Sequence, residues 1–204
     1  MVLRLGSRSP QPALADGQWP QESAPNLTAR IRVGDERVFA SLFLEHYDSL
    51  CEFVNSYLHA PDIAEEVVQS VFLRIWESRD SWDPKGSVRA FLFASCRNQA
   101  LDLLRHEQIV VRSAEGAEIG LGWSAPRAAD ADLEAAELAD RLSAVVAGLP
   151  ERRRLVVVLR WQHQLSNPEI AQILGISVKG VEMQFSRALA DLRRQLEQLA
   201  RDLV

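Results

Sequence analysis

Five side chains near the C-terminal end of the chain have types and spacing suited to contacting the edges of DNA bases. They are Lys179, Glu182, Met183, Gln184 and Arg187. An arginine binds a phosphate or a guanine edge, and a glutamine matches an adenine edge. A carboxylate such as Glu182 repels phosphates but accepts a hydrogen bond from a cytosine amino group. We interpret the five residues as the outer face of a DNA-reading helix.

The sequence around these residues predicts a helix-turn-helix that would hold them. Ser166 is a good N-cap, and Glu169 completes a capping box that satisfies two amide donors. Gly175 stands where a left-handed C-cap is needed, and Ser177 then caps the second helix. A helix-turn-helix presents the N-terminal part of its second helix to the major groove. An ordinary helical hairpin within a bundle is the alternative interpretation.

Apolar residues in the second helix recur at helical spacing and should face inward. They are Val178, Val181, Phe185, Ala188 and Leu192.

Composition excludes several other classes of protein. The 204 residues are 47% hydrophobic and 25% charged, with no apolar run long enough to span a membrane. We therefore expect a cytoplasmic protein without direct membrane insertion. Cys51 and Cys96 are the only cysteines, and we expect two reduced thiols. The four histidines are scattered, and neither a phosphate-binding glycine loop nor a nucleophile elbow occurs. We expect no metal, no cofactor, no small-molecule substrate and no enzymatic activity.

The net charge of −5 is unusual for a DNA-binding protein, but the charges are unevenly distributed. Residues 149–204 carry nine Lys and Arg against six Asp and Glu. Residues 85–105 carry four basic residues against one acidic residue. Such a chain neutralises few phosphates and should bind duplex DNA weakly by itself. The pattern indicates a DNA-binding protein that acts in complex with a larger partner.

Periodicity indicates an all-α fold of two small helical domains joined by a flexible linker, the C-terminal one containing the helix-turn-helix. We expect a mobile N-terminal tail over residues 1–26, rich in Pro, Gln, Ser and Gly, and a first helical domain over 27–107. A linker without periodicity covers 108–130, and a second helical domain covers 131–204.

A helix predicted from Ile63 to about Trp76 begins in capping-box style, with Asp62 and Glu65. Its expected buried residues are Ala64, Val67, Val68, Val71 and Ile75.

Three segments, in order, give the chain a resemblance to the sigma-70 family of bacterial RNA polymerase initiation factors, and to its extracytoplasmic-function (ECF) group in particular. The first is DIAEEVVQSVFLRIWE, and the second is SVRAFLFASCRNQALDLLR. The third is LPERRRLVVVLRWQHQLSNPEIAQILGISVKGVEMQFSRAL. Helix-turn-helix motifs alone are common, but the three segments together at this spacing are specific. The resemblance covers most of the chain from about Leu27 to Leu199 and excludes the tail and the linker.

The resemblance implies that residues 27–107 form sigma region 2, which binds the polymerase clamp and the −10 promoter element. It also implies that residues 131–204 form region 4, which binds the −35 element. The first segment would dock on the clamp through Glu65, Glu66, Gln69, Ser70, Leu73 and Trp76. Ser70 departs from the family pattern, because many relatives carry an acidic residue there. The charge pattern alone favours an ordinary solvated helix face, and only the resemblance favours the docking interpretation.

The second segment resembles the helix that reads and opens the −10 element. Groups suited to unstacked bases and phosphates are Trp82, Lys85, Arg89, Arg97, Asn98 and Arg105. The loop SRDSWDPKGS is the candidate pocket for a flipped base. Phe91 and Phe93 fit core packing better than stacking, and Asp102 is placed to pair with Arg105.

In the third segment, the five residues named first would read the −35 element. Glu182 departs from the family pattern, since many relatives carry a basic residue there. The resemblance therefore does not predict which promoter sequence the chain prefers. Arg152, Arg153 and Arg154 would hold phosphates or form a solvated face.

By resemblance the partners are core RNA polymerase, promoter DNA and an anti-sigma factor. The alternative function is a stand-alone helix-turn-helix repressor. A repressor explains the C-terminal motif but explains neither the clamp-like helix nor the negative net charge.

Overall fold

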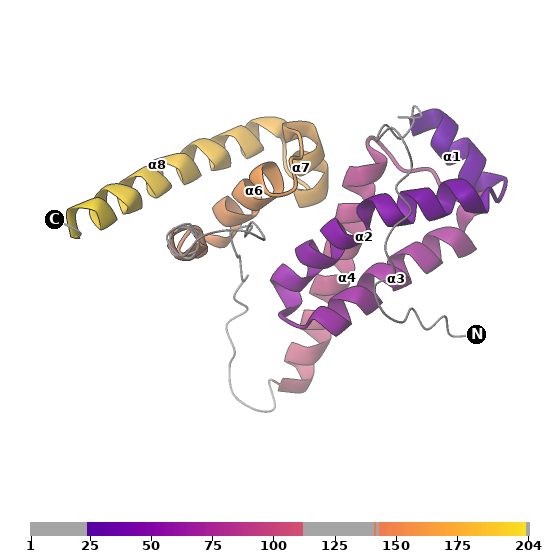
Figure 1. Ribbon diagram of the computed structural model, residues 1–204, viewed down its shortest axis with the longest axis horizontal. Helices are drawn as coiled ribbons and strands as arrows, with labels where there is room; N and C mark the ends of the chain where they lie inside the picture. Colours follow the sequence, from indigo (N-terminus) through magenta and orange to yellow (C-terminus); the bar gives the residue numbers. More distant parts are fainter. Residues whose placement is uncertain (1–23, 112–140, 142, 203–204) are drawn as a thin grey trace, which may run out of the picture.

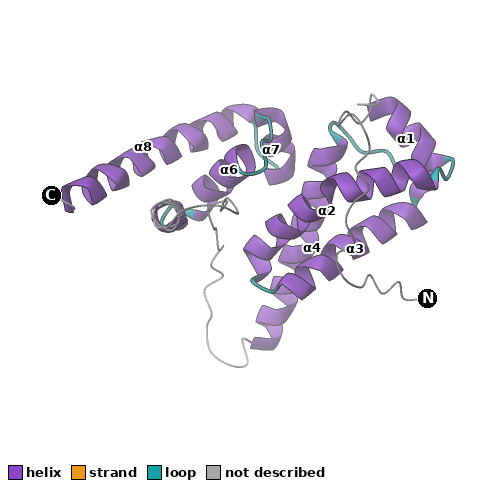
Figure 2. Ribbon diagram, viewed as in Figure 1, coloured by secondary structure: helices purple, strands orange, loops and turns teal. Residues whose placement is uncertain are grey.

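The computed structural model describes residues 24–111, 141 and 143–202, and within these residues every regular element is helical. This confirms the all-α prediction. Figure 1 and Figure 2 show the helices and their order along the chain. The elements are α1 (Ala24–Arg32), α2 (Glu36–Leu58), α3 (Pro61–Glu77), η1 (Arg79–Ser81), α4 (Val88–Val111), α6 (Glu151–Trp161), α7 (Asn167–Leu174) and α8 (Val178–Asp202).

Three helices, α2, α3 and α4, form the body of the N-terminal domain, and α1 and η1 cover one end of it. Asp35 caps α2 by accepting a hydrogen bond from the Val38 amide at 3.2 Å, and His59 ends the helix in the left-handed conformation. Phe53 and Phe93 lie fully buried between α2 and α4, with their ring centroids 5.0 Å apart. Aromatic packing at this distance adds to the stability that the buried apolar area provides.

Helix α3 confirms its predicted buried stripe, because all five expected residues are at most 5% exposed, and Phe72 joins them. Its start differs from the prediction. The N-cap is Ala60, which makes no side-chain capping bond, and Pro61 occupies the first turn. Proline suits that place because its missing amide hydrogen would be unpaired there. Asp62 thus lies inside the first turn, where its charge favours the positive end of the helix dipole.

The C-terminal domain contains α6, α7 and α8, preceded by a helical stretch at residues 143–147. Val145 and Val146 from that stretch pack against α6 and α8 in a small hydrophobic cluster. The clustered residues from the two long helices are Val157, Val158, Ala188 and Leu192.

Parts of the predicted organisation lie outside the described residues. These are the tail up to residue 23 and the segment from 112 to 140, which includes the predicted linker and the predicted start of the second domain. At the boundary that the structure does describe, α4 continues to Val111, four residues beyond the predicted end of the first helical domain.

The helix-turn-helix forms as predicted in its details. The Ser166 amide donates to the Glu169 carboxylate at 2.9 Å, and the Glu169 amide approaches the Ser166 hydroxyl oxygen at 3.5 Å. Gly175 ends α7 with φ +65°, a conformation that side chains rarely adopt, and Ser177 caps the start of α8 through the Gly180 amide at 3.1 Å. The inward prediction was wrong for Val178, which is 40% exposed because it lies in the first turn of α8, beyond the reach of the core.

The two domains are packed against each other. Helix α7 lies next to the end of α4 at which that helix begins (Figure 1). One continuous hydrophobic core joins Leu92 and Phe93 of α4 to Leu159 of α6 and Ile170 of α7. The sequence predicted two tethered domains and gave no sign of this contact.

His163, in the turn after α6, is the central polar residue of this contact and is only 3% exposed. Its ring packs edge-on against Phe53 and Phe93, with centroids 5.6 Å and 5.0 Å away, and Nδ1 lies 3.1 Å from the Ser49 hydroxyl. Burial and, to a smaller extent, the nearby positive charge of Arg89 together lower the pKa of His163 to about 4. The imidazole is therefore neutral at pH 7.

We predict that Ser166→Ala lowers the free energy of unfolding by about 1 kcal/mol, because the Ser166 hydroxyl loses its hydrogen bonds with the Glu169 amide and the Glu169 carboxylate. Urea unfolding followed by circular dichroism measures the change. Ser186→Ala, at an exposed position of α8, is the control and should change stability by less than about 0.5 kcal/mol. Equal stabilities of the two variants would show that the cap contributes nothing.

We also predict a loss of stability on acidification that depends on His163. Its pKa rises from about 4 to its ordinary value of 6.5 on unfolding, so the unfolded chain binds more protons in that window. Stability is then complete above pH 6.5 and falls as the pH drops toward 4, by on the order of 2 kcal/mol between pH 7 and pH 5. Urea unfolding at the two pH values should show this loss in the natural chain and a smaller loss in His163→Gln. His46, whose pKa burial also lowers, contributes in the same direction to both chains. An identical pH dependence of the two chains would contradict the assignment.

Candidate nucleic-acid interface

The candidate reading face lies on the N-terminal half of α8. Lys179, Glu182, Met183 and Arg187 are exposed, and Gln184 is half-buried. The structure thus brings together on one helix the residues that the sequence predicted. Met183 is 46% exposed, so this face combines an apolar side chain with charges of both signs. Such a surface can make hydrogen bonds to base edges and apolar contact with a thymine methyl group.

Contacts from α6 fix the orientation of α8. The guanidinium of Arg160 lies 4.7 Å from the centroid of the Phe185 ring, and Trp161 packs edge-on against that ring at 5.8 Å. Arg153 forms an ion pair with Asp191 of α8. Of the three arginines at the start of α6, Arg153 therefore holds the helices together, and Arg154 donates to the Ala147 carbonyl at 2.7 Å. Arg152 remains exposed and is the member of this group best placed for a phosphate.

Some of the predicted −10 residues on α4 are exposed, and others are in contact with neighbouring residues of the protein. Asn98 and Arg105 are exposed, and Arg105 makes the predicted ion pair with Asp102 at 2.8 Å. Arg97 is half-buried beside Tyr57; burial raises the pKa of Tyr57 to about 12, and the positive charge of Arg97 opposes the shift. Asn98 and Arg105 therefore form the accessible part of this helix.

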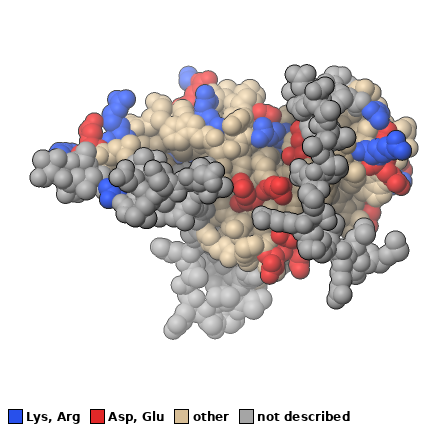
Figure 3. All heavy atoms as spheres, in the orientation of Figure 1, with Lys and Arg blue, Asp and Glu red and all other residues tan. Residues whose placement is uncertain are grey.

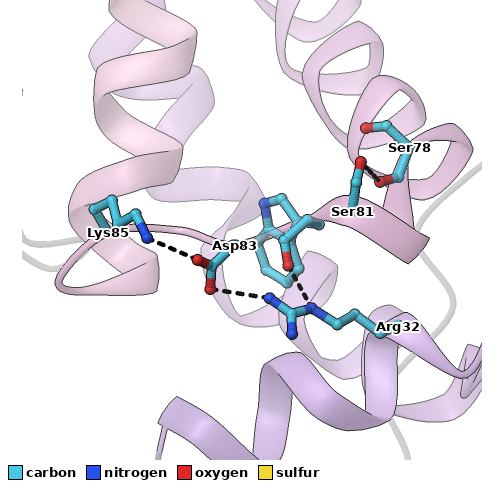
Figure 4. Close-up of polar contacts among 6 residues, drawn as sticks. Arg32, Ser78, Ser81, Asp83 and Lys85 are labelled. Carbon is cyan, nitrogen blue, oxygen red and sulfur yellow. Dashed lines mark hydrogen bonds and ion pairs between the residues drawn. The ribbon is translucent and has the colours of Figure 1, made fainter.

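The loop before α4 is held in place by polar contacts (Figure 4). Asp83 bonds to Arg32 at 2.9 Å and to Lys85 at 2.8 Å, and the bond from Lys85 is the main cause of the lowered pKa of Asp83. Arg32 also donates to the Trp82 carbonyl at 2.8 Å. No local signal identifies Arg32 as a loop partner, because it lies fifty residues earlier in the chain.

Trp82 lies in the core of this loop and is not a surface residue. Its ring is 5% exposed and packs edge-on against Phe91 at 6.0 Å. Stacking on a flipped base requires an open ring face. In this conformation Trp82 therefore supports the loop from below, and Lys85, whose side chain is 91% exposed, is the loop group open to a ligand.

The predicted clamp-binding residues share the outer side of α3. Glu65, Glu66, Gln69 and Leu73 are exposed, and Leu73 keeps 58% of its surface accessible. Trp76 is half-buried, in contact with Phe39 at 4.8 Å and beneath the Arg79 guanidinium at 4.7 Å.

Ser70 accepts a hydrogen bond from Gln99 of α4 at 3.0 Å. The outer side of α3 is thus acidic near its start, at Glu65 and Glu66, polar at Gln69 and Ser70, and apolar at Leu73.

On the face shown in Figure 3, Asp and Glu side chains predominate in the lower middle of the molecule, and side chains of both signs lie toward its two ends. Among the described residues, no group of three His, Cys, Asp or Glu side chains is placed to hold a metal ion. The helices described here include none with the length and apolar character needed to cross a bilayer.

Family models match both domains of the chain. Residues 42–109 match Sigma-70 region 2, and residues 139–192 match Sigma-70, region 4. The RNA polymerase sigma factor CnrH of Cupriavidus metallidurans is 31% identical over 186 residues, which are 87% of this chain and 96% of the relative. The ECF RNA polymerase sigma factor SigW of Bacillus subtilis is 27% identical over 178 residues, 83% of this chain and 95% of the relative.

Solved structures agree with these relatives. The structure of CnrH in complex with the cytosolic domain of CnrY aligns with a TM-score of 0.59 and 28% identity, over 85% of this chain and 96% of that chain. The sigma factor RpoE from Bartonella quintana, in complex with the anti-sigma factor NepR, aligns with a TM-score of 0.61 over 78% of this chain and 96% of that one. At 24% identity, this second match supports the fold alone. The chain therefore belongs to the extracytoplasmic-function group of the sigma-70 family of RNA polymerase sigma factors.

Proposed function

We propose that the chain binds core RNA polymerase through α3, opens the −10 element with α4 and reads the −35 element with α8. The observation that carries this proposal is the exposure, on separate helices, of one face with acidic residues and two faces whose side chains are suited to DNA. Glu66 is an exposed residue of the acidic face on α3, Asn98 of the face on α4, and Arg187 of the face on α8. A single DNA-binding motif would account for only the last.

The acidic side of α3 supports the polymerase contact. Long-range attraction to a basic clamp surface would speed encounter, and the exposed Leu73 would add apolar contact once the proteins meet. Gln69 and Ser70 supply hydrogen-bonding groups, each already tied to a neighbouring helix. Trp76, held by Phe39 and Arg79, would contribute an edge of its ring.

The −10 contact would rest on Asn98 and Arg105, with Lys85 at the loop and with Arg89 and Arg97 at other positions of α4. An exposed amide can hydrogen-bond to the edge of an unpaired base, and the basic side chains can hold phosphates. Trp82 would keep the loop in shape. Base stacking on Trp82 would require a rearrangement of its contact with Phe91.

The partners follow from the same proposal. Two solved structures similar to this chain are complexes of a sigma factor with a second protein, and one of those proteins is named an anti-sigma factor. We expect that an anti-sigma factor binds this chain as well. We also expect the chain itself to act with core polymerase in the cytoplasm. The chain would carry no catalytic activity and no cofactor of its own. The relatives described above are named sigma factors, which favours initiation over a stand-alone repressor.

Reconstitution with core polymerase tests the polymerase surface. The full chain should co-elute with core and produce promoter-dependent transcripts from genomic fragments on which core alone is silent. We predict that Glu66→Lys weakens core binding roughly threefold to tenfold, because it reverses a charge at an exposed contact. Glu197→Lys, an equal charge change at an exposed position of α8, is the control and should bind core normally.

Failure of the natural chain to bind core or to initiate any transcript would contradict the proposed function. Equal binding by the two charge variants would contradict only the role of α3.

The −35 face has its own prediction. Arg187→Ala should weaken promoter binding by the holoenzyme by about 1–3 kcal/mol, as expected for loss of a guanine or phosphate contact. Arg193→Ala, also exposed on α8 but beyond the reading face, is the matched control and should leave binding unchanged. Glu182→Gln should change the preferred −35 sequence in a selection from random promoters. An unaltered sequence preference would exclude Glu182 from base recognition, and equal effects of the two arginine variants would exclude Arg187.

A further inference from the structure

Three charged side chains meet at the loop that precedes α4, with Asp83 between Lys85 and Arg32 (Figure 4). The guanidinium of Arg32 donates to Oδ1 of Asp83 at 2.9 Å, and the ammonium of Lys85 donates to Oδ2 at 2.8 Å. Each oxygen of the carboxylate therefore has its own cation. Lys85, whose side chain is 91% exposed, is the member of this group that can turn away and reach a ligand.

Arg32 is anchored more firmly than Lys85. It lies in the last turn of α1, where a cation also favours the negative end of the helix dipole. Its Nε donates to the Trp82 carbonyl at 2.8 Å, so one guanidinium holds both the loop backbone and the Asp83 carboxylate. An arginine suits this task because its planar fork presents several donors in a fixed arrangement. Arg32 can therefore remain on Asp83 while Lys85 moves.

The carboxylate of Asp83 is unfavourable for DNA binding by the loop. It is 58% exposed, so it repels a phosphate that approaches the loop and competes with that phosphate for Lys85. Without Arg32, movement of Lys85 to a phosphate would leave Asp83 as an unpaired negative charge beside that phosphate. With Arg32 in place, the carboxylate keeps one cation, and the release of Lys85 costs less.

Holding the loop in shape is not the distinctive contribution of Arg32. Exposed ion pairs add little to stability, because water screens the charges and long side chains lose entropy. The loop also has other anchors, since the Trp82 amide donates to the Arg79 carbonyl at 3.0 Å and the Trp82 ring packs against Phe91 at 6.0 Å. What Arg32 adds to these anchors is a positive charge on Asp83.

We propose that Arg32 is a positioning residue for promoter recognition, which acts through Asp83 to make Lys85 available to a phosphate of the unpaired −10 strand. The proposal rests on the proposed function, because it requires that this loop meets the −10 element. Arg32 itself needs no contact with DNA. It serves as the permanent counterion of Asp83, so Lys85 exchanges a carboxylate for a phosphate without leaving a bare negative charge behind.

The salt dependence of single-strand binding tests this role. The probe is a fluorescent non-template strand that spans the −10 element of a promoter transcribed by the natural holoenzyme, and every variant is measured as holoenzyme. For single strands, the slope of log affinity against log salt changes by about 0.7 for each phosphate that the protein neutralises. Lys85→Ala should therefore make the slope shallower by about 0.7.

Arg32→Gln is the decisive variant, because its amide can still donate to the Trp82 carbonyl but carries no charge. We predict that its slope is also shallower by about 0.7, so that about a fourfold rise in salt weakens its binding roughly threefold less than that of the natural chain. Arg32→Lys restores the charge and should recover the natural slope. Arg37→Gln removes an equal charge at an exposed position of α2 and is the control, whose slope should be unchanged.

Asp83→Asn shows whether Arg32 acts through the carboxylate. Once the carboxylate is neutral, Lys85 needs no release, so addition of Arg32→Gln to Asp83→Asn should leave the slope as it is. A shallower slope in this double variant would overturn the proposal, as would a natural slope in Arg32→Gln or in Lys85→Ala. If the natural holoenzyme binds the −10 strand no better than a scrambled strand, the proposed function itself is contradicted.

Discussion

The burial of the His163 turn between α2 and α4 is the interaction on which the arrangement of the whole molecule depends. A neutral imidazole fits between Phe53 and Phe93 because burial keeps its pKa near 4, and its backbone carbonyl accepts from Arg89. The same turn leads directly into the helix-turn-helix. The position of α7 over the −10 loop is therefore a consequence of how this one residue is seated.

Charge distribution gives the physical reason for dividing the function between two domains. A chain with a net charge of −5 gains little from phosphate contacts, so its DNA surfaces are useful only when polymerase holds them near the promoter. The acidic face of α3 would then favour association with polymerase, because it attracts a basic partner.

Local signals in the sequence were sufficient to predict the helices and their caps, but they were insufficient to predict how the helices pack together. The Ser166 capping box and the left-handed Gly175 depend on neighbours within a few residues, and the structure confirms both. Trp82 was expected to face a ligand, but its burial depends on Phe91, and its loop depends on Arg32 far away in the chain. Nothing near His163 marks it as a buried residue. Periodicity describes one helix at a time, so contacts between domains cannot be derived from it.

The most direct test of the account is a nuclear Overhauser measurement on the free full-length chain. The His163 ring lies 5.0 Å from the Phe93 ring and 5.6 Å from the Phe53 ring, centroid to centroid. We predict cross-peaks between the His163 ring protons and the ring protons of both phenylalanines at pH 7. Absence of these cross-peaks, together with a His163 imidazole that titrates near 6.5, would show that the domains are apart and would contradict the account.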